Sequence, residues 1–159
     1  MGMDRLPLDG VDVVHDLQDF PWPFADNEFD LVLASHVLEH IPNLLRTLEE
    51  VQRILRPHGL FLVRVPYYRS EGAFRDPTHV RFFTERTFDY FAPDGATALS
   101  THNYYSSARF IVQKLEFGWA GRLSWHVDHY VGNERLRTFL HRALRHKKDE
   151  MHFTLVPVK

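Results

Sequence analysis

The chain has 159 residues, of which 44% are hydrophobic and 25% charged, and its net charge is -2. This length is typical of one domain with a real core, and so small a charge gives no global field that would favour nucleic acid or an anionic membrane. The absence of cysteine excludes disulfides, thiolate metal sites and a cysteine nucleophile, and it is consistent with a reducing, cytoplasmic location. No apolar run approaches the ~20 residues that a membrane helix needs. We therefore expect a single domain over residues 1–159.

The first half of the chain is predicted to alternate short strands with one helix. Residues 11–14 form a short strand, and residues 29–34 form an apolar run that is typical of a strand covered on both faces. Residues 42–56 carry one apolar stripe at helical spacing, and Pro57-His58-Gly59 predicts a turn after this helix. Residues 60–65 form a second buried strand. Strand, helix and strand at this spacing predict a right-handed parallel crossover.

The second half is predicted to contain shorter elements and one longer helix. Thr84 has a side chain that can cap a helix, and the last expected strand alternates apolar with polar residues, as a half-buried strand does. The expected elements are a polar loop over 67–80, a helix over 85–91, a strand over 110–117, a helix over 133–147 and a strand over 151–156.

Several motifs follow one another in the first 66 residues, mostly at the polar ends of the expected strands. In order they are Asp16-Leu17, Pro21 to Phe24, Asp26 to Asp30, Ser35 to His40 and Leu55 to Gly59. As an ordered series they resemble class I S-adenosylmethionine-dependent methyltransferases of type 11. Gly2-Met3-Asp4 is similar to the end of that family's second strand, with its acidic last residue. The resemblance implies an α/β fold: a Rossmann-like, open, mostly parallel sheet with an antiparallel C-terminal strand pair.

The resemblance also implies methyl transfer from S-adenosylmethionine and a set of cofactor-binding residues. A carboxylate at the end of a strand can accept both ribose hydroxyls, which makes Asp4 the candidate for that contact. Asp16 is expected to accept the adenine amino group with Leu17 beside the ring, while Ser35 and His36 are expected near the methionine portion or the methyl group. The alternative for Asp4 and Asp16 is turn formation, and for Ser35 and His36 it is entry into a helix.

The methyl acceptor is expected to be a small molecule with an oxygen or nitrogen nucleophile. Because the sulfonium carbon is already activated, catalysis is mainly alignment, and a base is needed only if the acceptor must lose a proton. The candidates for that base are His40, Asp76 and His79. The alternative for Asp76 and His79 is a capped turn that leads into the helix at Thr84. Tyr67, Tyr68, Trp119 and Trp125 suggest an aromatic-lined acceptor site.

The sequence lacks the glycine-rich loop of this family. Its eight glycines are isolated from one another, and none of them forms a GxG pattern. The loop and the first strand would lie before Met1, so we expect an N-terminally truncated domain that begins at the family's second strand. Such a chain is expected to bind the cofactor weakly and to form homo-oligomers through unpaired strand edges. The alternative is a non-catalytic binding or scaffolding protein, or a truncated remnant.

A rival pattern lies in the same segment. His36-Val37-Leu38-Glu39-His40 matches the H-x-x-E-H pattern of inverted zinc peptidases, in which His36 and His40 would share one helix face with Glu39 as a base. His36 directly follows a buried strand, however, and the helix begins near Pro42, so we predict no metal site. The basic face of the 133–148 helix could bind RNA, but such faces are usually solvated. We therefore expect neither a nucleic-acid partner nor a membrane partner.

Overall fold

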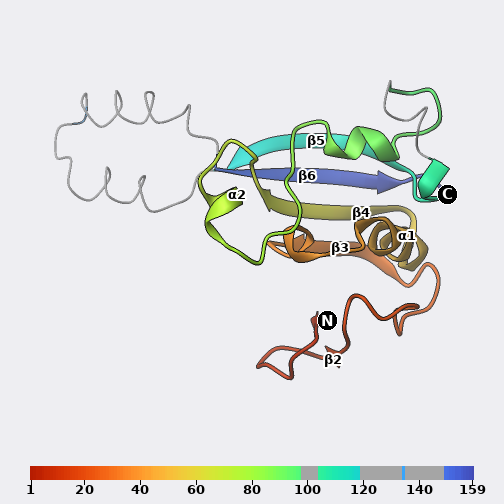
Figure 1. Ribbon diagram of the computed structural model, residues 1–159. Helices are drawn as coiled ribbons and strands as arrows, with labels where there is room; N and C mark the ends of the chain where they lie inside the picture. The colour runs from red at the N-terminus through yellow and green to blue at the C-terminus, as the bar shows by residue number, and fades with distance from the viewer. Residues whose placement is uncertain (98–103, 119–133, 135–148) are drawn as a thin grey trace.

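The structure is a computed structural model that describes residues 1–97, 104–118, 134 and 149–159 (Figure 1). Its elements form two separate sheets with short helices between the strands. In chain order the elements are β1 (Met3–Asp4), β2 (Val13–Val14), β3 (Phe29–Ser35), the 3-10 helix η1 (Leu38–His40), α1 (Leu44–Ile54), β4 (Leu55–Pro66), α2 (Gly72–Arg75), the 3-10 helix η2 (Thr87–Phe91), β5 (Phe110–Gly118) and β6 (Glu150–Pro157).

The larger sheet has four strands in the order β3-β4-β6-β5. β3 and β4 are parallel, with Ser35 opposite Arg64, and α1 connects them, which confirms the predicted strand–helix–strand unit. β5 and β6 are antiparallel, with Gly118 opposite Glu150, and β6 is also antiparallel to β4. The antiparallel pair expected at the C-terminus is therefore confirmed, and the sheet as a whole is mixed.

The smaller sheet consists of β1 and β2 alone. The two strands are parallel, with Met3 opposite Val13 and Asp4 opposite Val14. Figure 1 shows this N-terminal segment beyond β3, and no strand of the described residues pairs with the outer edge of β3. The two sheets thus lie beside each other without backbone pairing between them.

The core lies around α1 and the middle of the larger sheet. Asn43 caps α1, because its side chain accepts a hydrogen bond from the backbone amide of Arg46. Inside α1, every third or fourth residue is apolar, which places these side chains on one face. The members of the core cluster from α1 and the adjacent strands include Leu48, Val51, Ile54, Phe61, Val63, Phe153 and Leu155, all of them at most 2% exposed.

The loop before β3 is attached to α1 through the side chains of Glu50 and Arg53. The backbone amide of Trp22 donates to Glu50 at 2.7 Å, and Arg53 donates to Glu50 and to the carbonyl oxygens of Trp22 and Phe24. Burial raises the pKa of Glu50, but the hydrogen bonds from Arg53 and Trp22 and the Arg53 charge outweigh it, so the pKa lies below its ordinary value. Arg53 also reaches Asp26 at 2.8 Å.

Three local predictions need correction. Pro57-His58-Gly59 is not a turn between elements but an irregularity inside β4, where the pairing moves from Phe29–Leu55 to Leu31–Leu60 and His58 has φ 66°. The predicted helix over 85–91 is the shorter η2, which begins after Arg86. The polar loop over 67–80 contains α2, a helix of four residues.

Two further expectations concern the rest of the chain. The predicted helix over 133–147 lies outside the described residues except at position 134, so it stays a prediction. Across the described ranges, none of the helices combines the length and the apolar character that crossing a bilayer would demand.

Candidate functional site

The predicted adenosine residues lie at the ends of the two N-terminal strands. Asp4 ends β1, and Asp16 follows β2 by two residues, so the parallel pairing brings both carboxylates to the same end of this small sheet. Oδ1 of Asp4 accepts from the amide of Leu6 at 2.9 Å, and Oδ1 of Asp16 accepts from the amide of Gln18 at 2.8 Å. Both residues therefore form the turns that were the alternative interpretation. Among the described residues, neither Oδ2 has a hydrogen-bond partner.

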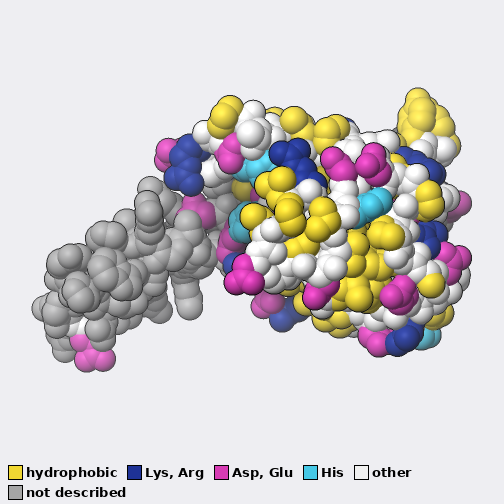
Figure 2. Space-filling view, turned by 90° about the horizontal axis from the view of Figure 1, so that it is seen from below, with side chains coloured by type: hydrophobic (Ala, Val, Ile, Leu, Met, Phe, Trp, Pro, Cys, Tyr) yellow, Lys and Arg dark blue, Asp and Glu magenta, His cyan; other side chains and the backbone are white. Residues whose placement is uncertain are grey.

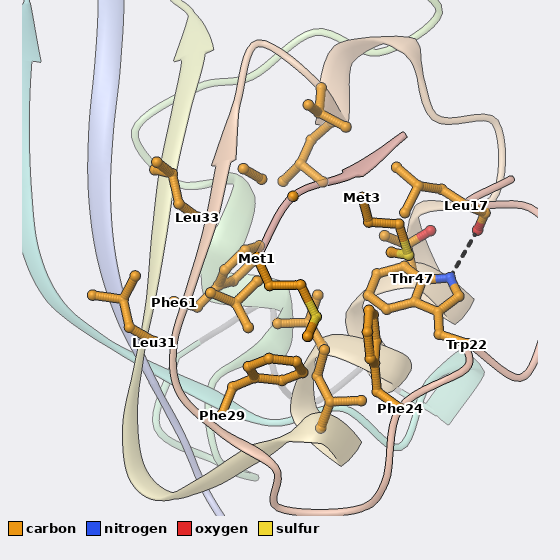
Figure 3. Close-up of a pocket in the computed structure, with 17 residues that line it drawn as sticks. Met1, Met3, Leu17, Trp22, Phe24, Phe29, Leu31, Leu33, Thr47 and Phe61 are labelled. Atoms are coloured by element: carbon orange, nitrogen blue, oxygen red, sulfur yellow. Dashed lines mark hydrogen bonds between the residues drawn. The ribbon is translucent and has the colours of Figure 1, made fainter. Parts of the chain in front are cut away.

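An apolar cavity of about 510 Å³ lies between the N-terminal segment and β3 (Figure 3). Met1 lies beside Phe29, and Met3 and Leu17 lie on the side of Trp22. The indole nitrogen of Trp22 donates to the carbonyl oxygen of Leu17 at 3.2 Å, which holds that wall in place. Of the five predicted cofactor residues, Leu17 lines the cavity and the other four do not.

The end of β3 carries Ser35 and His36, as the sequence predicted. His36 has φ 53°, a left-handed conformation that is uncommon for any residue other than glycine. Its amide donates to the carbonyl oxygen of Arg64, and its ring nitrogens lie 3.2 Å from Oε1 of Glu39 and 3.0 Å from Oε2 of Glu150. These contacts attach His36 to β4 and β6. Its predicted role beside the methyl group stays a prediction.

Glu150 is the carboxylate at which these polar contacts converge. Its carboxylate accepts hydrogen bonds from Arg64 at 3.2 Å and from His152 at 2.9 Å. It also faces the ring of His36. Burial raises the pKa of Glu150, but hydrogen bonds from His152 and Arg64 and the charge of Arg64 bring it below its ordinary value. Glu150 is therefore a fixed negative charge beside the end of β3. The sequence analysis missed it, because two of its partners, His36 and Arg64, lie far from it in the chain.

The three predicted base candidates come together beside η1. The rings of His40 and His79 are 4.8 Å apart between centroids and meet edge to face. The hydroxyl of Thr78 lies 3.0 Å from Nδ1 of His40 and 2.6 Å from Oδ1 of Asp76. Hydrogen bonds from the side chain and then the amide of Thr78 lower the pKa of Asp76. The capped turn that was the alternative interpretation is present as well, since Asp76 accepts from the amide of Thr78 at 2.8 Å.

The segment that carries Asp76 and His79 is bound to η1 by its backbone. The amides of Val80 and Arg81 both donate to the carbonyl oxygen of Glu39, at 2.9 and 3.1 Å. The guanidinium of Arg81 also donates to the carbonyl oxygens of Ile41 and Pro42. Residues nearly 40 positions apart in the chain are thereby held in contact. The sequence analysis did not single out Thr78 for this role, although Asp-Pro-Thr is a typical turn sequence that could have indicated it.

The arrangement expected for an inverted zinc peptidase is absent from this segment. His36 lies before η1 in a left-handed conformation, and η1 is a single 3-10 turn. His36 and His40 therefore do not share a helix face, and His36 faces Glu150 instead.

The expected aromatic site is only partly described. Tyr67 is buried and donates its hydroxyl to Glu85 at 2.7 Å, and Tyr68 lies edge to face against it. Trp119 and Trp125 lie outside the described residues.

Comparison with known proteins finds similarity to methyltransferases in the segment that carries this site. Residues 4–63 match the profile of the family described as "Methyltransferase domain", and that match includes Asp4, Asp16, Ser35, His36 and His40. Residues 4–63 are thus similar to methyltransferase domains. The fold of the chain is similar to that of an S-adenosylmethionine dependent methyltransferase from Mesorhizobium loti, at 13% identity and a TM-score of 0.52, over 89% of this chain and 67% of that one. It is also similar to the cyclase SpnF, at 18% identity and a TM-score of 0.51, over 91% of this chain and 56% of that one.

Curated relatives match the chain over shorter stretches. A sterol 4-C-methyltransferase of Caenorhabditis elegans is 46% identical over 41 residues, which are 26% of this chain and 12% of the relative. A demethylmenaquinone methyltransferase of Staphylococcus saprophyticus is 45% identical over 40 residues, which are 25% of this chain and 17% of the relative. The chain thus spans well under two thirds of the length of these relatives.

Proposed function

We propose that the protein transfers a methyl group from S-adenosylmethionine to an oxygen or nitrogen nucleophile of a small molecule. The observation that carries this proposal is the position of Asp4 and Asp16 at adjoining ends of two parallel strands, inside the segment that matches the methyltransferase domain. The carboxyl ends of parallel strands are the usual ligand-binding edge of open α/β sheets.

The residues at these strand ends fit an adenosyl group. Oδ1 of each aspartate is occupied by a turn hydrogen bond, but Oδ2 of each has no partner among the described residues and can accept from a ribose hydroxyl or the adenine amino group. Leu17, which lines the apolar cavity, offers an apolar surface for a flat ring. Bound S-adenosylmethionine would supply an activated methyl group.

The histidine pair beside η1 supplies a group that can accept a proton from the acceptor. Nδ1 of His79 lies 3.0 Å from the carbonyl oxygen of Ala73 and must donate to it, so Nε2 carries the lone pair. His40 has the same arrangement, because the Thr78 hydroxyl donates to Asp76 and therefore accepts from Nδ1 of His40. In our proposal one of these Nε2 atoms accepts the proton, and Asp76 positions His40 through Thr78.

A methyltransferase-like binding protein is the second candidate. The likeness to a cyclase favours keeping this candidate, because it illustrates that the fold alone does not fix the reaction.

The test is transfer of a tritium-labelled methyl group from S-adenosylmethionine to a panel of small alcohols, phenols and amines. Two proteins are compared: the chain itself, and a loop-extended chain in which the strand and glycine-rich loop of a methyltransferase relative are fused ahead of Met1. Labelled product from the loop-extended chain, with a weaker signal from the chain alone, supports methyl transfer. Cofactor binding without product from any acceptor supports the binding protein, and the absence of both contradicts the proposed site.

A further inference from the structure

We propose that Glu39, His40 and His79 bind a divalent transition-metal ion such as Zn²⁺. One ring nitrogen of each histidine and one carboxylate oxygen of Glu39 lie within 4.8 Å of one another. Two histidines and one carboxylate are a ligand set that zinc accepts in proteins. A bound ion would occupy the Nε2 atoms that the proposed base role requires, so metal binding and proton transfer at these atoms exclude each other. This proposal replaces the sequence-based expectation of no metal site.

The hydrogen bonds around both histidines leave the correct ring nitrogen for a metal. Nδ1 of His79 donates to a backbone carbonyl oxygen, that of Ala73, at 3.0 Å. Nδ1 of His40 donates to the hydroxyl of Thr78, which in turn donates to Asp76. Metal-binding histidines almost always donate their second ring N–H to a carbonyl or to a carboxylate-linked group, which fixes the tautomer. In both residues Nε2 is thus an unprotonated nitrogen in a ring of fixed orientation.

The third ligand is a buried carboxylate with an unsatisfied oxygen. Glu39 is 1% exposed, its Oε1 faces Nδ1 of His36, and its Oε2 has no hydrogen-bond partner among the described residues. A buried charged oxygen without a partner is costly and rare in folded proteins. A cation at the cluster would supply the missing partner.

The backbone brings the three ligands together before any ion binds. Glu39 and His40 are neighbours in η1, and the amides of Val80 and Arg81, which follow His79 directly, donate to the carbonyl oxygen of Glu39. The side chain of His79 is only 8% exposed. Two ligand atoms of one zinc ion are at most about 4.2 Å apart, twice a bond of about 2.1 Å. The cluster, at 4.8 Å or less, therefore needs only a small contraction.

The kind of ion follows from the ligand types. Imidazole nitrogens favour zinc, copper, iron or nickel over magnesium and calcium, which prefer sets of oxygen ligands. Three protein ligands leave a fourth position open, as in catalytic rather than structural zinc sites. The open position can take water or an oxygen of a small molecule.

The test is calorimetric titration of the metal-free protein with ZnCl₂, with magnesium chloride as the comparison ion. We expect the wild-type chain to bind zinc and His40→Gln and His79→Gln to bind it at least about tenfold more weakly. His58→Asn is the matched control, because His58 is exposed, lies outside the cluster and has a positive φ that asparagine tolerates. This control should bind zinc as the wild type does.

A second variant separates positioning from ligation. Thr78→Val keeps all three ligands but removes the hydroxyl that orients His40, so we expect affinity to fall by about 10- to 100-fold. Nitrogen-15 spectra of the imidazole rings should show zinc-dependent shifts at Nε2 of His40 and His79. Equal zinc affinity of the wild type and both glutamine variants would overturn the proposal, as would a wild-type chain that binds no zinc. Thermal melts without metal confirm that each variant is folded.

Discussion

The hydroxyl of Thr78 lies 3.0 Å from Nδ1 of His40, a residue 38 positions earlier in the chain. The same hydroxyl lies 2.6 Å from Asp76. Because the hydroxyl has one proton and Asp76 accepts it, His40 must donate its own Nδ1 proton to Thr78. A loop threonine thus sets which nitrogen of His40 can accept a proton or bind an ion.

We expect Thr78→Val to change the tautomer of His40. Without the hydroxyl, Nδ1 loses its acceptor, and the proton should move to Nε2 in a substantial part of the molecules. Nitrogen-15 shifts of the imidazole ring in metal-free protein, at a pH where His40 is neutral, measure the two populations. Thr154→Val, on β6, is the control and should leave His40 unchanged. The same tautomer in both variants and the wild type would show that Thr78 does not orient this ring.

The ion pair between Glu50 and Arg53 should make a measurable contribution to stability. In Arg53→Met, Glu50 keeps the Trp22 amide but loses a charged partner, and such hydrogen bonds contribute about 1.5–3 kcal/mol each. Urea unfolding near pH 7 measures the loss. Arg56→Met is the control, since Arg56 pairs with an exposed Asp30 and a surface pair of this kind contributes only about 0–1 kcal/mol. Equal losses of unfolding free energy in Arg53→Met and Arg56→Met would show that the Glu50–Arg53 pair contributes no more than a surface ion pair.

The same pair has a pH signature. The pKa of Glu50 is lowered in the folded state, so its stabilising effect is present above the ordinary glutamate value of 4.5 and is lost as the pH falls below it toward the folded pKa. The stability difference between wild type and Arg53→Met should therefore shrink between about pH 5 and pH 3. A difference that stays constant over this range would mean that Glu50 is not the group involved.

Tyr67 should titrate later than an ordinary tyrosine. Its hydrogen bond to Glu85, together with burial and the Glu85 charge, raises its pKa to about 12. A folded-state pKa above the ordinary 10.0 means that this contribution to stability is present below pH 10.0 and is lost as the pH rises toward about 12. Phenolate absorbance should show a transition near pH 12 that disappears in Tyr67→Phe. A transition that persists in Tyr67→Phe would assign it to another tyrosine.

Much of the fold could be predicted because the apolar runs that become β3 and β4, and the alternation that becomes β6, are local signals. The irregularity at His58 could not be predicted. Proline and glycine indicate a turn, but they do not tell whether it lies within a strand or between two elements. The histidine cluster is a different case. His40 and His79 were singled out from the sequence as candidate bases, which stays a prediction. Their contact depends on two amides that donate to the carbonyl oxygen of Glu39, and no sequence pattern indicates such a bond.

The outer edge of β3 should promote self-association. Leu31 is 49% exposed and Leu33 58% exposed, and Figure 2, which views the molecule from the side of β3 and the N-terminal segment, shows hydrophobic side chains gathered there among acidic ones. Exposed strand edges with apolar side chains pair readily with other chains. We expect Leu33→Lys to weaken self-association by about tenfold or more, given the roughly 1.5–3 kcal/mol of burying one leucine.

Sedimentation velocity over a range of protein concentrations measures this effect. Leu8→Lys is the matched control, because Leu8 is 57% exposed but lies in a loop. The control should associate like the wild type. Two results would show that the β3 edge does not mediate self-association. One is a wild-type chain that stays monomeric at all concentrations, and the other is a Leu33→Lys variant that associates as strongly as the wild type.

The most direct test of our account is a calorimetric titration of the loop-extended chain with S-adenosylmethionine, comparing Asp4→Asn and Asp16→Asn with the wild type. Asparagine can still form the observed turns, so these variants remove the charge without removing the turn. Asp9→Asn, in an exposed loop, is the control. We predict that the Asp4 and Asp16 variants each bind about tenfold more weakly, the difference between a charged and a neutral hydrogen bond, while the control is unchanged. Wild-type affinity in both the Asp4 and the Asp16 variant would contradict an adenosyl site at the ends of β1 and β2.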